Sequence, residues 1–183
     1  MPRSGAEART RLREAALELY LDQGYDSTTT AQIAERAGVT ERTYFRHFAD
    51  KREVLFGGEA ELRDVMISAI EQADNDAGPL ALVIAAYTAA VPLFIIGRPI
   101  AIRRAGIIAT TPALSERAQA KSASLADSIV SALVERGIPE PTARLAAHVG
   151  AAAFTRASGT WYPDPSQDLA ALIASAAEEI RSL

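Results

Sequence analysis

The amino-acid sequence predicts an all-α protein of about nine helices, in which a small helix-turn-helix head is followed by a larger helical body. Three observations support this fold class. Alanine and leucine are abundant, apolar residues recur at intervals of three and four positions, and β-branched residues almost never alternate with polar ones. Hydrophobic residues make up 49% of the 183 positions, which is enough for a substantial core. We expect the head to span residues 1–50 and the body residues 51–183.

A first helix is expected before Gly24, which stands where a left-handed C-terminal cap belongs. Its apolar side chains recur at helical spacing: Leu12, Ala15, Ala16, Leu19 and Tyr20. Near its start, one acidic residue, Glu7, accompanies four basic ones: Arg3, Arg9, Arg11 and Arg13. This local positive charge suits contact with a nucleic-acid backbone or minor groove, and it is equally typical of a solvated chain end.

Two short helices joined by an Ala-Gly-Val turn are expected within residues 29–48. Thr29 and Gln32 have the spacing of a capping box at the start of the first helix, and Thr40 is expected to cap the second. The outer face of the second helix carries hydrogen-bond donors, an acceptor and an aromatic edge: Glu41, Arg42, Thr43, Phe45 and Arg46. This pattern is typical of a helix-turn-helix that reads DNA.

This motif and the run Tyr44-Phe45-Arg46-His47-Phe48-Ala49-Asp50-Lys51 resemble the TetR family of bacterial repressors. The resemblance is specific from about Ala8 to Leu55, and beyond that only length and helical content agree. It implies a homodimer, formed through the two C-terminal helices, that binds a palindromic operator in double-stranded DNA and releases it when a small molecule binds. One position departs from the family pattern: Phe45 stands where a tyrosine is usual, so a hydroxyl group that would bond a phosphate is absent.

Nine residues in and directly after the head are expected to contact DNA. Arg42, Thr43 and Arg46 are assigned to base edges. The other six complete the contact: Thr29, Thr30, Thr40, Phe45, His47 and Lys51. Four of these six, namely Thr29, Thr30, His47 and Lys51, are expected to hold phosphates, which fixes orientation without reading sequence.

The body is expected to consist of successive helices. The pair Gly57 and Gly58 interrupts a helical pattern that opens near Lys51, which indicates either a pivot between head and body or close packing against a neighbouring helix. A helix over residues 80–96 is apolar almost all round and contains Pro92, so a buried core helix is favoured over a membrane span. Further helices are expected over residues 99–108, 112–136, 141–159 and 166–182.

Two sets of residues in the last two helices favour association of two chains. Small residues of the penultimate helix leave a smooth surface: Ala146, Ala147, Gly150, Ala151, Ala152 and Ala153. The last helix offers an apolar stripe: Leu169, Leu172, Ile173, Ala176 and Ile180. We expect these surfaces to form the dimer interface, and the alternative is that both helices pack within one chain.

Polar and aromatic groups on the apolar body helices are candidates for a ligand pocket: Tyr87, Phe94, Arg103, Arg104, His148, Phe154, Arg156, Trp161 and Tyr162. Tyr87 and Phe94 suit the core equally well. Either arginine would favour an anionic ligand if it pointed inward, because a buried guanidinium requires a partner. The order of Arg103-Arg104, Thr110-Thr111-Pro112 and Trp161 also resembles actinobacterial TetR regulators thought to sense acyl-coenzyme A thioesters.

The residue inventory argues against an enzyme. The chain has two histidines and no cysteine, so neither a metal cluster nor a nucleophile with its base is visible, and we expect no metal and no cofactor. No secretion signal is visible either, so a cytoplasmic protein is expected. The formal net charge is −4, but residues 1–56 carry as many basic as acidic residues. This neutral head and Phe45 keep a second class open: a helical small-molecule-binding or adaptor protein that has lost DNA binding.

Overall fold

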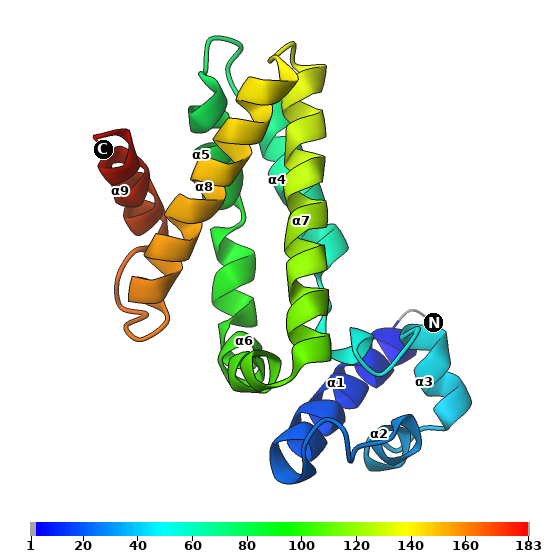
Figure 1. Cartoon of the computed structure of the whole chain (residues 1–183). Coiled ribbons are helices and arrows are strands. Elements are labelled where there is room, and N and C mark those ends of the chain that lie inside the picture. Colours follow the sequence, from blue (N-terminus) through cyan, green and yellow to red (C-terminus); the bar gives the residue numbers. More distant parts are fainter. Residues whose placement is uncertain (1–2, 183) are drawn as a thin grey trace. The chain divides into compact units, whose positions relative to one another are not determined.

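The computed structural model describes residues 3–182, which form nine α-helices, one 3-10 helix and no strand (Figure 1). The expected all-α fold is confirmed. In chain order the elements are α1 (Arg3–Gln23), α2 (Thr30–Arg36), α3 (Glu41–His47), the 3-10 helix η1 (Glu53–Leu55), α4 (Glu59–Gln72), α5 (Pro79–Ala89), α6 (Val91–Thr110), α7 (Pro112–Glu135), α8 (Glu140–Trp161) and α9 (Leu169–Arg181).

The chain divides into two compact units. The first comprises Met1–Gly57 together with Ile100–Gln119, and the second comprises Gly58–Pro99 together with Ala120–Leu183. Helices α6 and α7 therefore each contribute residues to both units. The first unit thus contains a segment that lies about fifty residues beyond the sequence boundary expected for the head.

The first unit has a core of its own. Helix α1 buries its apolar stripe, and Tyr44 of α3 and Leu55 of η1 are fully buried in the same cluster. Ile107 and Leu114 also belong to this cluster, so the end of α6 and the start of α7 help to form the core behind the helix-turn-helix. Burying a side chain of this size contributes about 1.5–3 kcal/mol relative to exposing it.

Local sequence signals place the helix ends of the first unit as expected. The Thr29 hydroxyl accepts a hydrogen bond from the Gln32 amide at 3.2 Å, and the Gln32 side chain accepts one from the Thr29 amide at 2.8 Å. Thr40 accepts from the Thr43 amide at the start of α3. Gly24 and Gly38 have φ angles of +86° and +66°, which glycine adopts without the steric cost a side chain would bring. The predicted capping box, the Thr40 cap and the Gly24 cap are confirmed.

The fourth helix begins at Glu59, and the expectation that it opens near Lys51 is wrong. The Asp50 carboxylate does accept hydrogen bonds from the amides of Arg52 and Glu53, but the element that it caps is the short η1. The chain is then extended at Phe56 and turns through Gly58, whose φ is +85°. The two glycines therefore separate two elements instead of interrupting one helix.

The middle of the body also differs from the expectation. The helix expected over residues 80–96 is broken at Ala90, and the helix expected over 99–108 is the second half of α6. Pro92 lies in the first turn of α6, where its missing N–H is not needed, whereas Pro99 is tolerated inside the helix. Within residues 3–182 no single helix has the length and apolar character of a membrane span, and α5 and α6 meet that test only as a pair bent by 57°.

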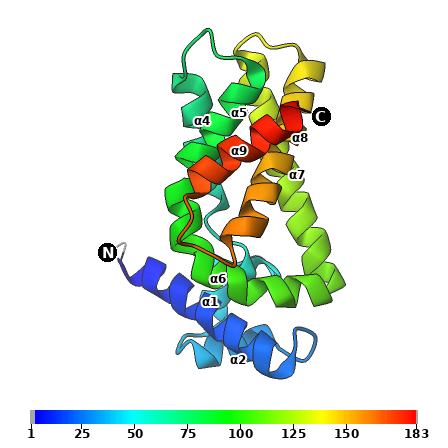
Figure 2. The same cartoon turned by 90° about the vertical axis from the view of Figure 1, so that its left-hand side faces the viewer.

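The core of the second unit is built by α4, α5, α8 and α9 together with the later part of α7. Figure 2 shows α9 lying across α5 and α8. A β-carbon added at Gly150 of α8 would lie 2.3 Å from the Val83 side chain of α5, so the glycine permits this close approach. At the end of α7, the Arg136 guanidinium donates to the main-chain oxygens of Ile70 and Ala73, which secures the C-terminal end of α4.

Most of the residues assigned to a dimer interface are buried within the chain itself. They comprise Ala146, Ala147, Gly150 and Ala153 of α8 and Leu169, Ile173 and Ala176 of α9. Small residues let helices approach closely whether the neighbour belongs to the same chain or to another, so composition alone could not distinguish the two cases. For these side chains the alternative of packing within one chain is the correct one.

Candidate nucleic-acid interface

The outward face of α3 is set by one buried residue on its inner face. Tyr44 is fully buried, and its hydroxyl donates to the main-chain oxygen of Asp50 at 3.0 Å. Burial raises the pKa of this hydroxyl, so it remains a proton donor at neutral pH. With Tyr44 turned inward, Arg42 and Arg46 are exposed on the opposite side of a helix only two turns long. The face that carries the predicted base contacts is therefore free to meet a ligand.

Phe45 lies on this outward face with 53% of its surface exposed. Its ring meets the edge of the Tyr44 ring, with centroids 5.4 Å apart and planes at 81°. Phe45 is thus held in place at its base while most of the ring faces solvent. An exposed, positioned aromatic ring can make van der Waals contact with a sugar or a thymine methyl group, but it offers no hydrogen bond to a phosphate.

Hydroxyl groups join the starts of α2 and α3. The Thr30 hydroxyl donates to the Glu41 carboxylate at 2.5 Å, and the hydroxyls of Thr40 and Thr43 are 3.0 Å apart. Thr30, which is expected to hold a phosphate, and Thr43, which is expected to contact a base, are thus each positioned by a neighbouring side chain. They fix the entry of both helices, and each hydroxyl oxygen keeps a further lone pair for another partner.

Lys51 is engaged inside the first unit. Its ammonium group donates to the main-chain oxygens of Tyr25 at 2.7 Å and Thr28 at 3.0 Å and lies 4.0 Å from the centre of the Tyr25 ring. The Tyr20 hydroxyl donates to the main-chain oxygen of Lys51. Burial lowers the pKa of Lys51. The side chain thus stabilises the connection between α1 and α2. Two of its three N–H groups are used in this way, and a phosphate contact through the third stays a prediction.

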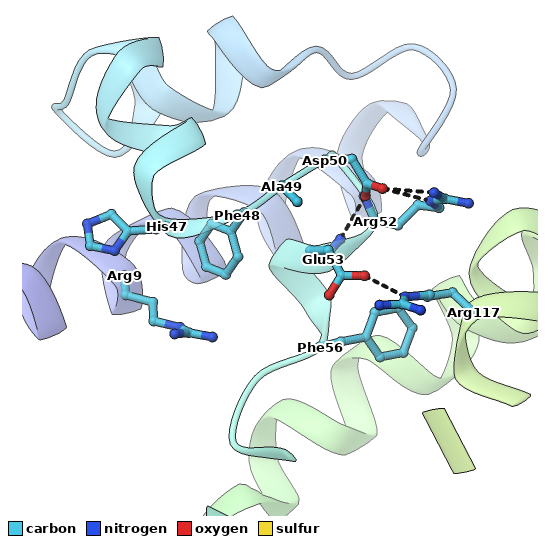
Figure 3. Close-up of a pocket in the computed structure, with 9 residues that line it drawn as sticks. All are labelled: Arg9, His47, Phe48, Ala49, Asp50, Arg52, Glu53, Phe56 and Arg117. Atoms are coloured by element: carbon cyan, nitrogen blue, oxygen red, sulfur yellow. Dashed lines mark hydrogen bonds and ion pairs between the residues drawn. The ribbon is translucent and has the colours of Figure 1, made fainter. Parts of the chain in front are cut away.

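A pocket of about 360 Å³ lies beside the C-terminal end of α3 (Figure 3). His47 and Arg9 lie at one end of it, separated from the ion pairs at the other end. The Nε2 atom of His47 is buried without a hydrogen-bond partner among the described residues, and the Arg9 guanidinium lies 5.2 Å from the centre of the Phe48 ring. Burial, with smaller contributions from Arg46 and Arg9, lowers the pKa of His47.

Two ion pairs close the other end of this pocket. Asp50 and Arg52 are 2.8 Å apart, and Glu53 and Arg117 are 2.5 Å apart. The hydrogen bond from Arg52 lowers the pKa of the Asp50 carboxyl group. Because these charges compensate each other, the net positive charge of the pocket lies at the Arg9 end, where an anion such as a phosphate would be favoured.

The remaining terminal arginines are distributed differently. The guanidinium of Arg13 approaches Gly57 so closely that a β-carbon there would lie 2.0 Å from its Nη2 atom, and its Nε atom is buried without a partner in the described part of the chain. Arg11 reaches toward Gly38 in the turn between α2 and α3. The side chain of Arg3 lies outside the described residues. Arg9 is therefore the residue of this set that lies at the candidate site.

Arg103 and Arg104, which were expected in a ligand pocket, belong to the first unit. Arg103 forms an ion pair with Glu14 of α1 at 2.6 Å. Arg104 donates to the main-chain oxygen of Leu55 at 2.8 Å and lies 5.9 Å from the centre of the Phe56 ring. Each guanidinium finds its partner within the head unit, so their assignment to a pocket in the body is wrong.

The aromatic candidates of the second unit split into two groups. Tyr87, Phe94 and Phe154 form one cluster, in which the rings of Tyr87 and Phe154 stack at 4.9 Å and those of Phe94 and Phe154 approach to 4.5 Å. Burial raises the pKa of Tyr87 to about 12. This cluster belongs to the packed core. Trp161 is also buried but lines a separate cavity, next to Tyr162.

Two polar candidates of α8 face solvent. His148 is exposed, with Nδ1 2.7 Å from the main-chain oxygen of Arg144 in the preceding turn. Arg156 is exposed and pairs with Glu179 at 3.5 Å. The structure therefore does not bring either residue to a pocket with Trp161.

Arg98 was not among the residues predicted from the sequence to bind a ligand. Its guanidinium lies 5.6 Å from the centre of the Trp161 ring, in the cavity that Trp161 lines. One signal could have identified it: Arg98 is the single charged residue between Pro79 and Ile102. A lone charge in an apolar stretch that folds into the body has to find a partner there.

Comparisons with known proteins show what the N-terminal part of the first unit is similar to. Residues 12–56 match the family model described as bacterial regulatory proteins, tetR family. The HTH-type transcriptional regulator TcmR of Streptomyces glaucescens is 41% identical over 81 residues, which are 44% of this chain and 36% of that protein. The chain thus aligns with about a third of the length of the curated relatives that it matches. The expected resemblance of the head to the TetR family is confirmed.

Solved structures extend the similarity to the fold of the whole chain. The fatty acid degradation regulator FadR from Bacillus halodurans superimposes with a TM-score of 0.63 and 16% identity over 93% of both chains. Thermus thermophilus FadR, a TetR family repressor in complex with lauroyl-CoA, gives a TM-score of 0.56 with 21% identity over 92% of this chain and 90% of that one. At these identities the similarity concerns the fold.

Proposed function

We propose that this chain, whose N-terminal segment is of the TetR type, is a sequence-specific DNA-binding transcriptional regulator, a homodimeric repressor that a small molecule releases from its operator. One observation carries the proposal: α3 is capped by Thr40, anchored by the buried Tyr44 and exposes Arg42 and Arg46 on its outer face. A rigid helix that presents guanidinium groups is suited to the major groove, where arginine reads guanine.

In this proposal the contacts fall into two classes. Arg42, Thr43 and Arg46 contact base edges. The phosphates are held by residues around α2 and by the pocket at the end of α3: Thr29, Thr30, His47, Lys51 and Arg9. The cationic Arg9, which lines this pocket together with His47, supports a phosphate there. Thr40 and Phe45 support and flank the reading helix.

Two copies of the chain would place their α3 helices in successive major grooves, about 34–36 Å apart, on a palindromic operator. The dimer is proposed to form through the exposed sides of α8 and α9. Leu145 of α8 supports this, because 66% of this large apolar side chain is exposed in the single chain.

The effector is proposed to be a small anionic or acyl-coenzyme A-like molecule that binds in the second unit. Arg98 beside Trp161 supports an anion, and the Thermus thermophilus neighbour was solved with lauroyl-CoA. The protein is proposed to act inside the cell and without catalytic activity, metal or cofactor. Its named relatives are transcriptional regulators, which supports a role other than that of an enzyme.

Fluorescence anisotropy with the DNA that flanks the gene tests this function. We expect binding to that duplex, no comparable binding to a scrambled one, two chains per site, and weaker binding at about 200 mM than at about 50 mM salt. R42A should lose sequence selectivity. R63Q is the matched control, because Arg63 of α4 pairs with Asp64 on an exposed surface of the other unit. If the operator lies elsewhere, selection from a random pool of duplexes should recover it. Absence of selective binding both to the flanking duplex and to any selected duplex would overturn the proposal.

The alternative is a helical ligand-binding or adaptor protein that has lost DNA binding. The engagement of Lys51 by Tyr25 and Thr28 favours it, because that ammonium group has a structural role in the absence of DNA. This alternative predicts that ligand binding persists while neither the flanking duplex nor a selected one binds above the scrambled control.

A further inference from the structure

A cavity of about 300 Å³ lies in the second unit, between the first half of α6, the end of α8 and the connection to α9. Its walls are largely apolar, with Val91, Ile95 and Leu169 beside the indole of Trp161. Ile95 is 54% exposed, so the cavity reaches the surface on that side. This volume is at the lower end of the range of small-molecule sites, about 300–1,000 Å³.

One cation lies in these walls. Arg98 donates from Nη2 to the main-chain oxygen of Tyr162, and its guanidinium lies over the Trp161 ring. Its Nε atom is buried and has no hydrogen-bond partner, and none of the described carboxylates forms an ion pair with it. The side chain as a whole is half-buried and lines the cavity, so the guanidinium N–H groups that are not bonded to Tyr162 are donors for an oxygen atom that enters it.

The acidic residue in the wall does not compete for this donor. The Asp168 carboxylate accepts hydrogen bonds from the amides of Ala170 at 2.9 Å and Ala171 at 3.3 Å, where it caps the start of α9. Its negative charge nevertheless remains close by, and it disfavours a ligand with several negative charges. The cavity therefore suits one negative charge on an otherwise apolar molecule.

We propose that this cavity binds a compact monocarboxylate, whose carboxylate pairs with the Arg98 guanidinium and whose aromatic or aliphatic body packs against Trp161. A molecule that fills the cavity is much smaller than a complete acyl-coenzyme A ester, so the proposal narrows the anionic effector class to free small acids. Binding itself is independent of DNA, and only the consequence that occupancy alters operator binding rests on the function proposed above.

Trp161 is the single tryptophan of the chain, so its fluorescence reports on this cavity directly. The full chain would be titrated with benzoate and hexanoate, and with benzamide and hexanamide as uncharged molecules of matched shape. We expect a saturable change in emission with at least one acid, and at least tenfold weaker binding of its amide. No saturable change with either acid, or equal binding of acid and amide, would overturn the proposal.

Variants at Arg98 test its role within this experiment. R98Q should weaken binding of the acid at least tenfold and leave the weak binding of the amide unchanged, whereas R63Q should affect neither. The amide monitors whether the cavity keeps its shape, because its binding does not depend on the charge. If R98Q weakened acid and amide equally, or weakened neither, Arg98 would not be the anchor of the carboxylate.

A parallel titration of the protein on its operator separates the two proposals. Acid binding by a chain that binds no DNA would overturn the regulatory function and leave the cavity assignment intact. DNA binding by a chain whose tryptophan emission does not respond to either acid would overturn the cavity assignment and leave the regulatory function intact.

Discussion

Arg103 of α6 and Glu14 of α1 form an ion pair, with 2.6 Å between Nη1 and the carboxylate, although 89 positions separate them in the sequence. The two side chains are 39% and 40% exposed, so the pair contributes little to stability, about 0–1 kcal/mol. Arg104 adds a bond to the main chain at Leu55. Consecutive arginines of α6 thus contact α1 and η1 within the first unit.

This placement predicts that Arg103 and Arg98 behave differently in ligand binding. R103A should leave the emission titration of Trp161 with benzoate or hexanoate unchanged, because the side chain belongs to the first unit. R98Q should weaken the same titration at least tenfold. Loss of acid binding in R103A would contradict the assignment of this residue to the head.

We expect substitutions of Arg42 and Lys51 to affect DNA binding in different ways. R42A should cost about 1–3 kcal/mol of specific DNA binding and relax the preference at one base position, because Arg42 is exposed on α3. K51A should weaken binding to all sequences alike. It should also lower the free energy of unfolding, because two main-chain acceptors at Tyr25 and Thr28 lose their donor. Anisotropy against single-base variants of the operator, with urea unfolding in parallel, measures both effects.

Substitutions of two adjacent residues of α3 should distinguish a role in stability from a role in DNA contact. Y44F removes a hydrogen bond to the main-chain oxygen of Asp50 and should cost about 0.5–1.5 kcal/mol of unfolding free energy. F45A should change stability by less than about 0.5 kcal/mol, because the Phe45 ring is largely exposed, while it weakens DNA binding. Chemical denaturation of both variants measures these two changes in the free energy of unfolding. Equal destabilisation by both substitutions would show that Phe45 is part of the core.

Local signals along the chain were sufficient to predict where the helices of the helix-turn-helix begin and end. Thr29, Thr40 and Gly24 act on their immediate neighbours, so their effect can be recognised from spacing alone. The body was harder because its determinants are contacts between distant segments. Helical periodicity shows that Arg103 lies on a helix but not that Glu14 of α1 is its partner. Small residues such as Gly150 likewise predict close approach without identifying the neighbouring helix.

The break at Ala90 illustrates a different limit. Pro92 is compatible with the first turn of a helix and also with a kink inside one, so an apolar run from residue 80 to 96 does not reveal where one helix ends. Arg98 stands alone in the sequence, whereas Arg103 and Arg104 form an adjacent pair that is easier to recognise. Its significance depends on the buried Trp161, which follows 63 positions later in the sequence.

We expect His47, in the pocket beside α3, to make the free energy of unfolding depend on pH. The pKa of His47 is lowered in the folded chain from an ordinary value of 6.5, so the unfolded chain binds the proton more readily. Stability should therefore decrease as pH falls below about 6.5 toward the lower pKa of the folded state. His47→Gln should remove this part of the decrease, measured by urea unfolding between about pH 7.5 and pH 5.5. An unchanged profile in H47Q would assign the dependence to another group.

Two glycines of α8 provide the sharpest test of how this helix packs. A β-carbon at Gly150 would lie 2.3 Å from Val83 Cγ1, whereas nothing lies within 4 Å of one at Gly159. G150A should destabilise the chain by about 1–3 kcal/mol through overpacking. G159A should be neutral or stabilising by up to about 1 kcal/mol, because alanine is the better helix former.

Thermal unfolding at several protein concentrations, with sedimentation to determine the oligomeric state, distinguishes the neighbour that Gly150 meets. If Gly150 packs on α5 of its own chain, G150A lowers the free energy of unfolding by the same amount at every concentration. A loss that appears as dissociation of a dimer, and that higher protein concentration reverses, would instead place a partner chain against this face of α8.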